Sequence, residues 1–160
     1  MTTAKQMMHM GVECVPATET LDRAAQMMRD MQVGSLPICG PDNKLKGILT
    51  DRDIVVNCVA HGKDPSKMTA GELATGDLVW VDAKADEDEV LRLMEQNLIR
   101  RVPVMEDHVL VGMISEADLA QHLDDAKLHH FVSTITAAPP TPAMAMARTR
   151  ASSGRKSKTK

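Results

Sequence analysis

The sequence has almost no aromatic residues: among 160 residues there are no Tyr, one Phe and one Trp. Proteins that bind single-stranded nucleic acid usually stack bases on several aromatic faces, so this composition disfavours that class, and sugar-stacking lectins likewise. The hydrophobic share is nevertheless 43%, supplied by aliphatic residues and 13 Met. At this length the chain can bury a sizeable single core, and a multidomain enzyme is not expected.

Long apolar runs are missing as well. No segment approaches the roughly 20 apolar residues that a bilayer span needs, and the first residues lack the apolar stretch of a signal peptide. We therefore expect a cytoplasmic protein, while noting that secretion without a classical signal would leave no trace in the sequence. The three cysteines, Cys14, Cys39 and Cys58, are too few and too scattered for a disulfide-rich secreted scaffold.

Acidic residues are absent after Asp125, whereas six basic residues lie between Arg148 and Lys160. Residues 1–136 therefore hold 13 basic against 22 acidic residues, a charge of about −9, and such an acidic body is a poor partner for duplex DNA. Residues 137–160 are rich in Pro, Ala, Ser and Lys without apolar periodicity, which predicts a disordered basic tail. This tail is either merely solvated or a weak electrostatic arm for an acidic partner or nucleic acid.

The body of the chain is an internal repeat. Residues 17–38 align without gaps on residues 83–104 at an offset of 66, and after one deletion the segment from Gly47 aligns on the segment from Gly112. A unit of roughly 60 residues buries too little surface alone, so we expect the two copies to pack sheet to sheet about a pseudo-twofold axis. That arrangement would give two equivalent clefts.

We place the first repeat at residues 4–66 and the second at 67–130, each with the order β-α-β-β-α and hence an α/β fold. Short β-branched runs are typical of strands, and apolar residues at helical spacing are typical of a helix. The first two strands should be parallel with a right-handed crossover, and the third should pair back as a hairpin. The expected elements are strands 12–15, 35–39 and 45–49 around helix 20–31, strands 79–81, 101–105 and 110–114 around a helix over 90–98, and closing helices after Thr50 and Ser115.

Each copy ends its last strand on a hydroxyl residue and places an acid three residues later, as Thr50 with Asp53 and Ser115 with Asp118. One interpretation is a capping box, in which the hydroxyl and the carboxylate satisfy backbone N–H groups at the start of a helix. The other is a ligand site, in which the hydroxyl and free N–H groups hold a phosphate and the acid accepts from a ribose diol. Spacing alone does not separate the two.

These motifs resemble those of a tandem CBS-domain pair, also called a Bateman module. The resemblance rests on glycine-containing strands that run into (T/S)-x-x-D at 47–53 and 112–118, preceded by 36–38 and 102–104, and it covers nearly the whole body. Several strings, among them 49–55, are similar in particular to the stand-alone members of the family that act in the actinobacterial response to hypoxia.

The resemblance implies a regulatory module without catalysis that senses energy or redox stress. Its ligand would be an adenosyl compound such as AMP, ADP, ATP, NAD or S-adenosylmethionine, bound in the clefts between repeats, with no obligatory cofactor. It also implies a homodimer packed through helices and an unknown protein effector. The implied roles are ribose binding by Asp53 and Asp118, phosphate contact by Thr50 and Ser115, and an adenine slot lined by Ile38 and Val104. The alternative is a ligand-free interaction or structural stress protein whose (T/S)-x-x-D motifs are only helix caps.

The two sites are not expected to be equal. Arg52 beside the first hydroxyl can supply positive charge to a phosphate, whereas Glu116 beside the second adds a repelling charge. Arg100 and Arg101 replace small residues of the first copy. Their planar guanidinium groups suit bidentate phosphate contact, or else ion pairs with nearby acids.

Cys14 and Cys39 fall on the two strands expected to be parallel neighbours, where a Cα separation of roughly 4.4–6.8 Å would permit a disulfide. The alternatives are a redox-responsive staple or two buried thiols. Cys58, His61 and the pair at 129–130 do not provide the ligand pattern of a zinc site, so no metal site is predicted.

Overall fold

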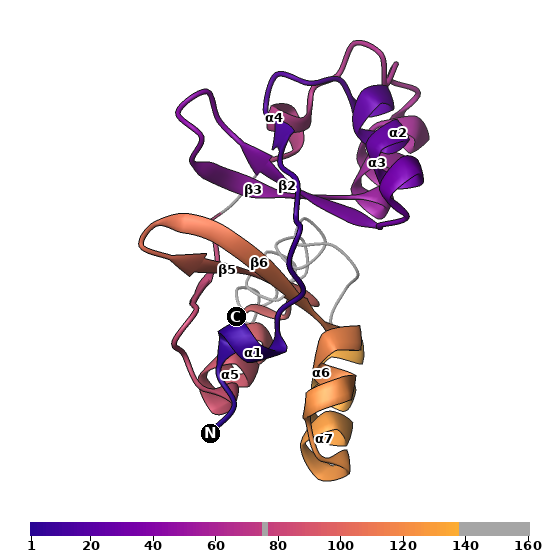
Figure 1. Cartoon of the computed structure of the whole chain (residues 1–160). Coiled ribbons are helices and arrows are strands. Elements are labelled where there is room, and N and C mark those ends of the chain that lie inside the picture. Colours follow the sequence, from indigo (N-terminus) through magenta and orange to yellow (C-terminus); the bar gives the residue numbers. More distant parts are fainter. Residues whose placement is uncertain (75–76, 138–160) are drawn as a thin grey trace, which may run out of the picture.

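A computed structural model describes residues 1–74 and 77–137 and contains two three-stranded sheets that lie one above the other (Figure 1). In each sheet the first two strands are parallel and the last two form an antiparallel hairpin, which confirms the predicted α/β repeat. The first sheet has the order β1 (Val15–Pro16), β2 (Ser35–Cys39), β3 (Leu45–Thr50), and the second has the order β4 (Val81–Asp82), β5 (Arg101–Glu106), β6 (Val109–Ser115).

The long helix of the first repeat has its predicted bounds to within one residue, whereas that of the second repeat was predicted over 90–98 and begins three residues earlier, at Glu87. The first one buries Leu21, Ala24 and Met28 on one face and ends at Gln32, which adopts the left-handed conformation. No helix in the described ranges is long and apolar enough to cross a bilayer. The helices are α1 (Ala4–Met7), α2 (Leu21–Met31), α3 (Asp51–Asn57), the 3-10 helix η1 (Val59–His61), α4 (Ala70–Leu73), α5 (Glu87–Asn97), α6 (Glu116–His122) and α7 (Asp125–Thr136).

The first strand of each repeat is shorter and lies later than predicted. Of the run 12–15 only Val15 is paired, together with Pro16, which lies just beyond the predicted strand. Proline is tolerated here because β1 is an edge strand, where a missing N–H costs no ladder bond. The preceding residues leave the sheet because the chain comes from α1, which lies against the other repeat (Figure 1).

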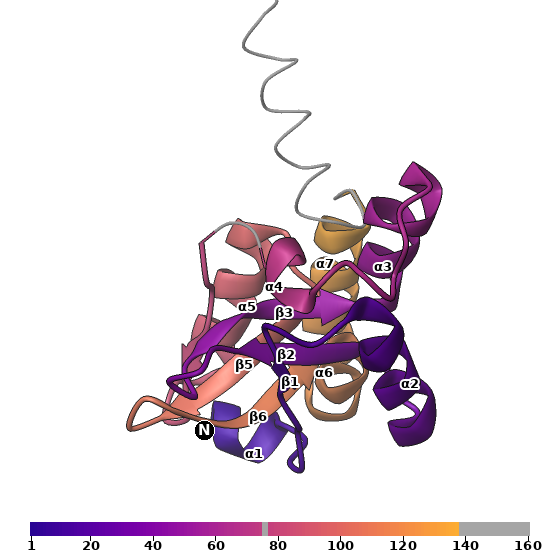
Figure 2. The ribbon, with the colours of Figure 1, turned by 90° about the horizontal axis from the view of Figure 1, so that it is seen from above.

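Each repeat is completed by a short helix from the other one. The N–H of Ala4 in α1 donates to the carbonyl of Ala85 at 2.8 Å, and the N–H of Ala70 in α4 donates to the carbonyl of Glu19 at 2.9 Å. Ala4 and Met7 are buried in the core of the second repeat, and Ala70 is buried in the core of the first. Figure 2 shows α1 beside β6, a strand of the other repeat that comes about 100 residues later in the chain.

The same local pattern starts α1 and α4, the two helices that the repeats exchange. The N–H of Thr3 donates to Oε1 of Gln6 at 2.9 Å, and the N–H of Thr69 donates to Oε2 of Glu72 at 2.6 Å. These pairs lie 66 residues apart, the offset of the repeat. The internal repeat therefore extends back over the exchanged helices.

The second repeat carries one further helix, α7, that the repeat pattern does not predict. It buries Phe131 and Ile135 completely in the core of that repeat. Lys127 ties it to α5 through Glu87 at 2.6 Å and Asp88 at 2.8 Å. The predicted tail lies outside the described residues except for Ala137.

The exchange makes a stability prediction for residues near the amino terminus. Met7 is 1% exposed and Met10 is 76% exposed. Met7→Ala should lower the free energy of unfolding by about 2–5 kcal/mol because it opens a cavity in the core of the second repeat. Met10→Ala, the matched control, should change it by less than about 0.5 kcal/mol. Equal effects of the two substitutions in urea unfolding would contradict the exchange.

Candidate functional site

The hydroxyl–acid pairs of both repeats stand at the start of a helix that directly follows a strand; we call Thr50 with Asp53 the first site and Ser115 with Asp118 the second site. In the first site Oγ1 of Thr50 accepts from the N–H of Asp53 at 3.0 Å, and Oδ2 of Asp53 accepts from the N–H of Thr50 at 2.9 Å. In the second site Oδ2 of Asp118 accepts from the N–H of Ser115 at 2.8 Å and from its hydroxyl at 2.6 Å. Both hydroxyl–acid pairs therefore form the capping box that was one of their two interpretations.

Asp118 has an additional partner that the sequence analysis did not single out. Nδ1 of His9 lies 2.8 Å from Oδ2 of Asp118, the oxygen that already caps α6. Burial raises the pKa of the Asp118 carboxyl, but the hydrogen bonds from Ser115 and His9 lower it by more, so the net pKa lies below its ordinary value. The carboxylate is thus held in its charged form at neutral pH.

The residues expected to line an adenine slot are core residues in this structure. Ile38 pairs with Val15 on one side and Gly47 on the other, and its side chain is fully buried. Val104 is equally buried on the corresponding strand, β5. Neither side chain presents surface to a ligand in this conformation.

Arg100 forms the ion pair that was one of its two expected roles. Its Nη1 lies 2.7 Å from Oε1 of Glu116, and its Nη2 donates to the carbonyl of Ile135 at 3.5 Å. The repelling charge that Glu116 was expected to add to the second site is therefore offset. Arg52 is exposed at the start of α3.

Arg101 belongs to the second repeat but lies against the first. A Cβ on Gly34 would stand 3.7 Å from Nη2 of Arg101 and 3.3 Å from Oδ2 of Asp51. Arg101 is half-buried, and within residues 1–74 and 77–137 no acid lies within 4.0 Å of its guanidinium. The guanidinium of Arg101 therefore lies beside Gly34 at the start of α3, where Asp51 and Arg52 also lie, and a Cβ on Gly34 would be at ordinary van der Waals distance from it.

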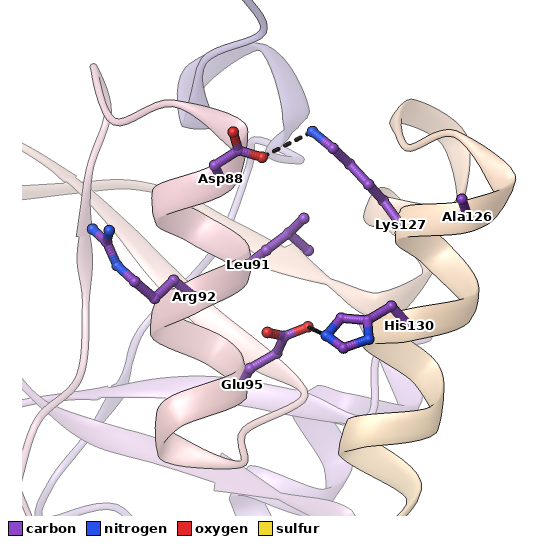
Figure 3. Close-up of a pocket in the computed structure, with 7 residues that line it drawn as sticks. All are labelled: Asp88, Leu91, Arg92, Glu95, Ala126, Lys127 and His130. Carbon is purple, nitrogen blue, oxygen red and sulfur yellow. Dashed lines mark hydrogen bonds and ion pairs between the residues drawn. The ribbon is translucent and has the colours of Figure 1, made fainter.

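A groove of about 420 Å³ runs between α5 and α7 on the outside of the second repeat (Figure 3). Leu91 points from α5 toward α7, while Lys127 pairs with Asp88 and His130 lies 3.7 Å from Glu95. The carboxylates of Asp88 and Glu87 raise the pKa of Lys127. None of the predicted ligand residues lines this groove, which is the seam where α7 docks.

Cys14 and Cys39 lie together at the end of the first sheet. Their Sγ atoms are paired as a disulfide, and their Cα atoms are 5.7 Å apart, within the separation that a disulfide requires. Cys14 immediately precedes β1 instead of lying on it, because the strand starts later than expected. Cys58 is buried, and its thiol donates to the carbonyl of Lys63 at 3.5 Å. In the described part of the chain no group of three or more His, Cys, Asp or Glu residues is placed to hold a metal ion.

Comparison with known proteins agrees with this architecture. The protein-family model of the CBS domain matches residues 4–59 and 70–125. Hypoxic response protein 1 of Mycobacterium tuberculosis is 51% identical over 135 residues, which cover 84% of this chain and 94% of that protein. This similarity confirms the likeness to the actinobacterial hypoxic response members that the sequence indicates.

Two solved structures share the fold. The crystal structure of Hypoxic Response Protein I with two coordinated zinc ions is 53% identical, covers 77% of this chain and 100% of that chain, and has a TM-score of 0.69. The hexameric CBS-CP12 protein from bloom-forming cyanobacteria is 28% identical, covers 79% of this chain and 74% of that chain, and has a TM-score of 0.71.

The lowered pKa of Asp118 predicts an acid-dependent loss of stability. A depressed carboxyl pKa contributes stability above the unfolded-state pKa, and this contribution disappears as the pH falls through the folded-state value. Asp118→Asn should therefore cost about 1–3 kcal/mol at pH 7, and the gap to the wild type should shrink toward pH 3. Chemical unfolding at several pH values measures it, with exposed Asp107→Asn as the control. A gap that is the same at pH 7 and pH 3 would refute the assignment.

The position of the two cysteines predicts a redox-dependent stability. A bond that closes a loop with a sequence separation of 25 restricts the unfolded chain, so reduction should lower the free energy of unfolding by about 3 kcal/mol. The double variant Cys14→Ser/Cys39→Ser should not respond to reductant. Alkylation of all three cysteines in unfolded, oxidised protein, detected by mass spectrometry, would show that the bond is not formed.

Proposed function

The chain belongs to the CBS-domain family and carries two CBS domains, and we propose that it is a non-enzymatic regulatory module that binds an adenosyl nucleotide between its repeats. One observation carries this proposal. Arg101 crosses from the second repeat to the start of α3 and has no acidic partner among the described residues. A guanidinium there, together with Arg52, supplies the positive charge that a phosphate requires.

In the proposed complex each group at the first site has a separate task. Asp53 accepts from the two ribose hydroxyls with both oxygens of its carboxylate, whose Oδ2 also accepts from the N–H of Thr50, and Thr50 contacts phosphate. Arg52 and Arg101 neutralise the phosphate charge. The side chain of Ile38 is fully buried, so adenine can bind against it only if the residues that pack over it move aside. The second site would use Ser115, Asp118 and Val104 in the same way.

We propose that ligand binding reports energy or redox stress to a protein effector in the cytoplasm. The support is the similarity to a protein that is named for the hypoxic response. A ligand changes such a module only through unequal affinity for two conformations, and two repeats that exchange helices provide elements whose relative position can change.

We also propose that the module forms a homodimer through its helices. The outer face of α3 and η1 presents Val55 and Val59, which are 56% and 55% exposed. The two valines are four residues apart in the sequence, and exposed apolar side chains of this kind gain by burial against a partner. A related CBS-CP12 protein forms hexamers.

The alternative function is that of a ligand-free interaction or structural protein in the stress response. It is favoured by the hydrogen bonds in both sites, since Asp53 and Asp118 each already cap a helix. It requires no role for Arg101.

Calorimetric titration separates the two functions. AMP, ADP, ATP, NAD and S-adenosylmethionine are titrated into the reduced and the oxidised protein. At least one should bind in the micromolar range, with binding lost in the double variant Asp53→Ala/Asp118→Ala. Arg101→Ala should weaken binding by about tenfold, because a charge-assisted contact to phosphate is removed. Arg92→Ala is the matched control, since Arg92 is an exposed arginine beside the α5–α7 groove.

The outcome that contradicts nucleotide binding is a folded protein that gives no heat with any of the five compounds. That result would favour the ligand-free alternative. Because a related structure contains two coordinated zinc ions, zinc chloride is titrated in parallel. A ligand whose affinity depends on the redox state would bring Cys14 and Cys39 into the mechanism.

A further inference from the structure

The chain segment that follows α1 is fixed against the second site. His9 and Met113 form an isolated antiparallel bridge, with N–H to carbonyl distances of 3.0 and 3.2 Å in the two directions. A Cβ on Gly112 would stand 2.8 Å from the carbonyl oxygen of His9 and closer still to the sulfur of Met8. The absence of a side chain at Gly112 therefore allows the segment to lie directly on β6.

The imidazole of His9, in this segment, contacts the carboxylate of Asp118 in the second site. Oδ2 of Asp118 receives the N–H and the hydroxyl of Ser115 and faces Nδ1 of His9 at 2.8 Å, so one oxygen has three partners. The side chain of Asp118 is 17% exposed and that of His9 is 50% exposed. From α6 itself, Nδ1 of His122 lies 2.8 Å from the backbone carbonyl of Asp118 and leaves the carboxylate to His9.

The first site has no comparable occupant in the described part of the chain. The offset of the repeat places Ala74 at the position of Met8, and its Cβ would lie 3.2 Å from a Cβ on Gly47. The residue at the position of His9 is Thr75 in the sequence, which carries no imidazole. Within residues 1–74 and 77–137, the hydrogen-bond partner of the Asp53 carboxylate is the N–H of Thr50.

We propose that His9 acts as an internal competitor that closes the second site to ribose, so that the first site is the one that takes a ligand. This inference rests on the proposed nucleotide function. A ribose diol needs the carboxylate of Asp118, and a tethered imidazole competes for it at high effective concentration. His9 is therefore a specificity-determining residue that makes two similar sites unequal.

The test compares ligand stoichiometry in the full chain. The wild type should bind one molecule per chain of AMP, ADP, ATP, NAD or S-adenosylmethionine. His9→Ala should bind a second one, with an affinity at the second site raised by at least about tenfold, and adding Asp118→Ala to this variant should abolish the second event. Gly112→Ala is an independent variant, because its Cβ pushes the His9 carbonyl away. Met10→Ala, an exposed neighbour, should behave as the wild type.

The number of ligands bound by each variant tests the role of His9 and the nucleotide function separately. One ligand in both the wild type and His9→Ala, or two ligands in the wild type, would overturn the role of His9 and leave the nucleotide function standing. Binding in His9→Ala alone, lost on adding Asp118→Ala, would support the role of His9 and move the function to the second site. No binding in the wild type, His9→Ala or Gly112→Ala, all folded by thermal unfolding, would overturn the nucleotide function and this inference with it.

Discussion

The exchange of α1 and α4 is the constraint on which the rest of the structure depends. Each helix is four residues long and too short to be stable alone, so it exists through the backbone bonds and apolar burial that it gains on the other repeat. In return it closes a core that its host repeat leaves open. Neither half is complete without the other, so both sites belong to one shared frame.

Differences between the two sites arise from a few side chains on this shared frame. At the first site the guanidinium of Arg101 comes from the other repeat and lies beside Gly34. In the second repeat the position of Gly34 is taken by Arg100, which pairs with Glu116 beside the second site. The segment after α1 brings an imidazole to Asp118, whereas the matching segment brings alanine to Gly47. Duplication therefore provides the symmetry, and single substitutions remove it.

Local patterns predicted the elements and the strand pairing within each sheet, but not the contacts between the repeats. The strands, the long helices and the capping pairs were predictable because period and spacing act within about a dozen residues. Thr3 with Gln6 and Thr69 with Glu72 repeat the same spacing and could have revealed the exchanged helices. No local pattern, however, joins His9 to Asp118, which are 109 residues apart, or turns Arg101 toward Gly34. These contacts follow from packing, which a single sequence does not display.

The exchange also sets an order of events during synthesis on the ribosome. In the second repeat, the hydrogen-bond partners of α1 and the segment after it lie 78 to 109 positions further along the chain, from Ala83 to Asp118. Because domains form as the chain emerges, α4 can join the first repeat early, whereas α1 must wait until the second repeat has been made. The segment of α1 is thus among the last to find its place, and the second site is finished by residues that are translated well before the rest of it.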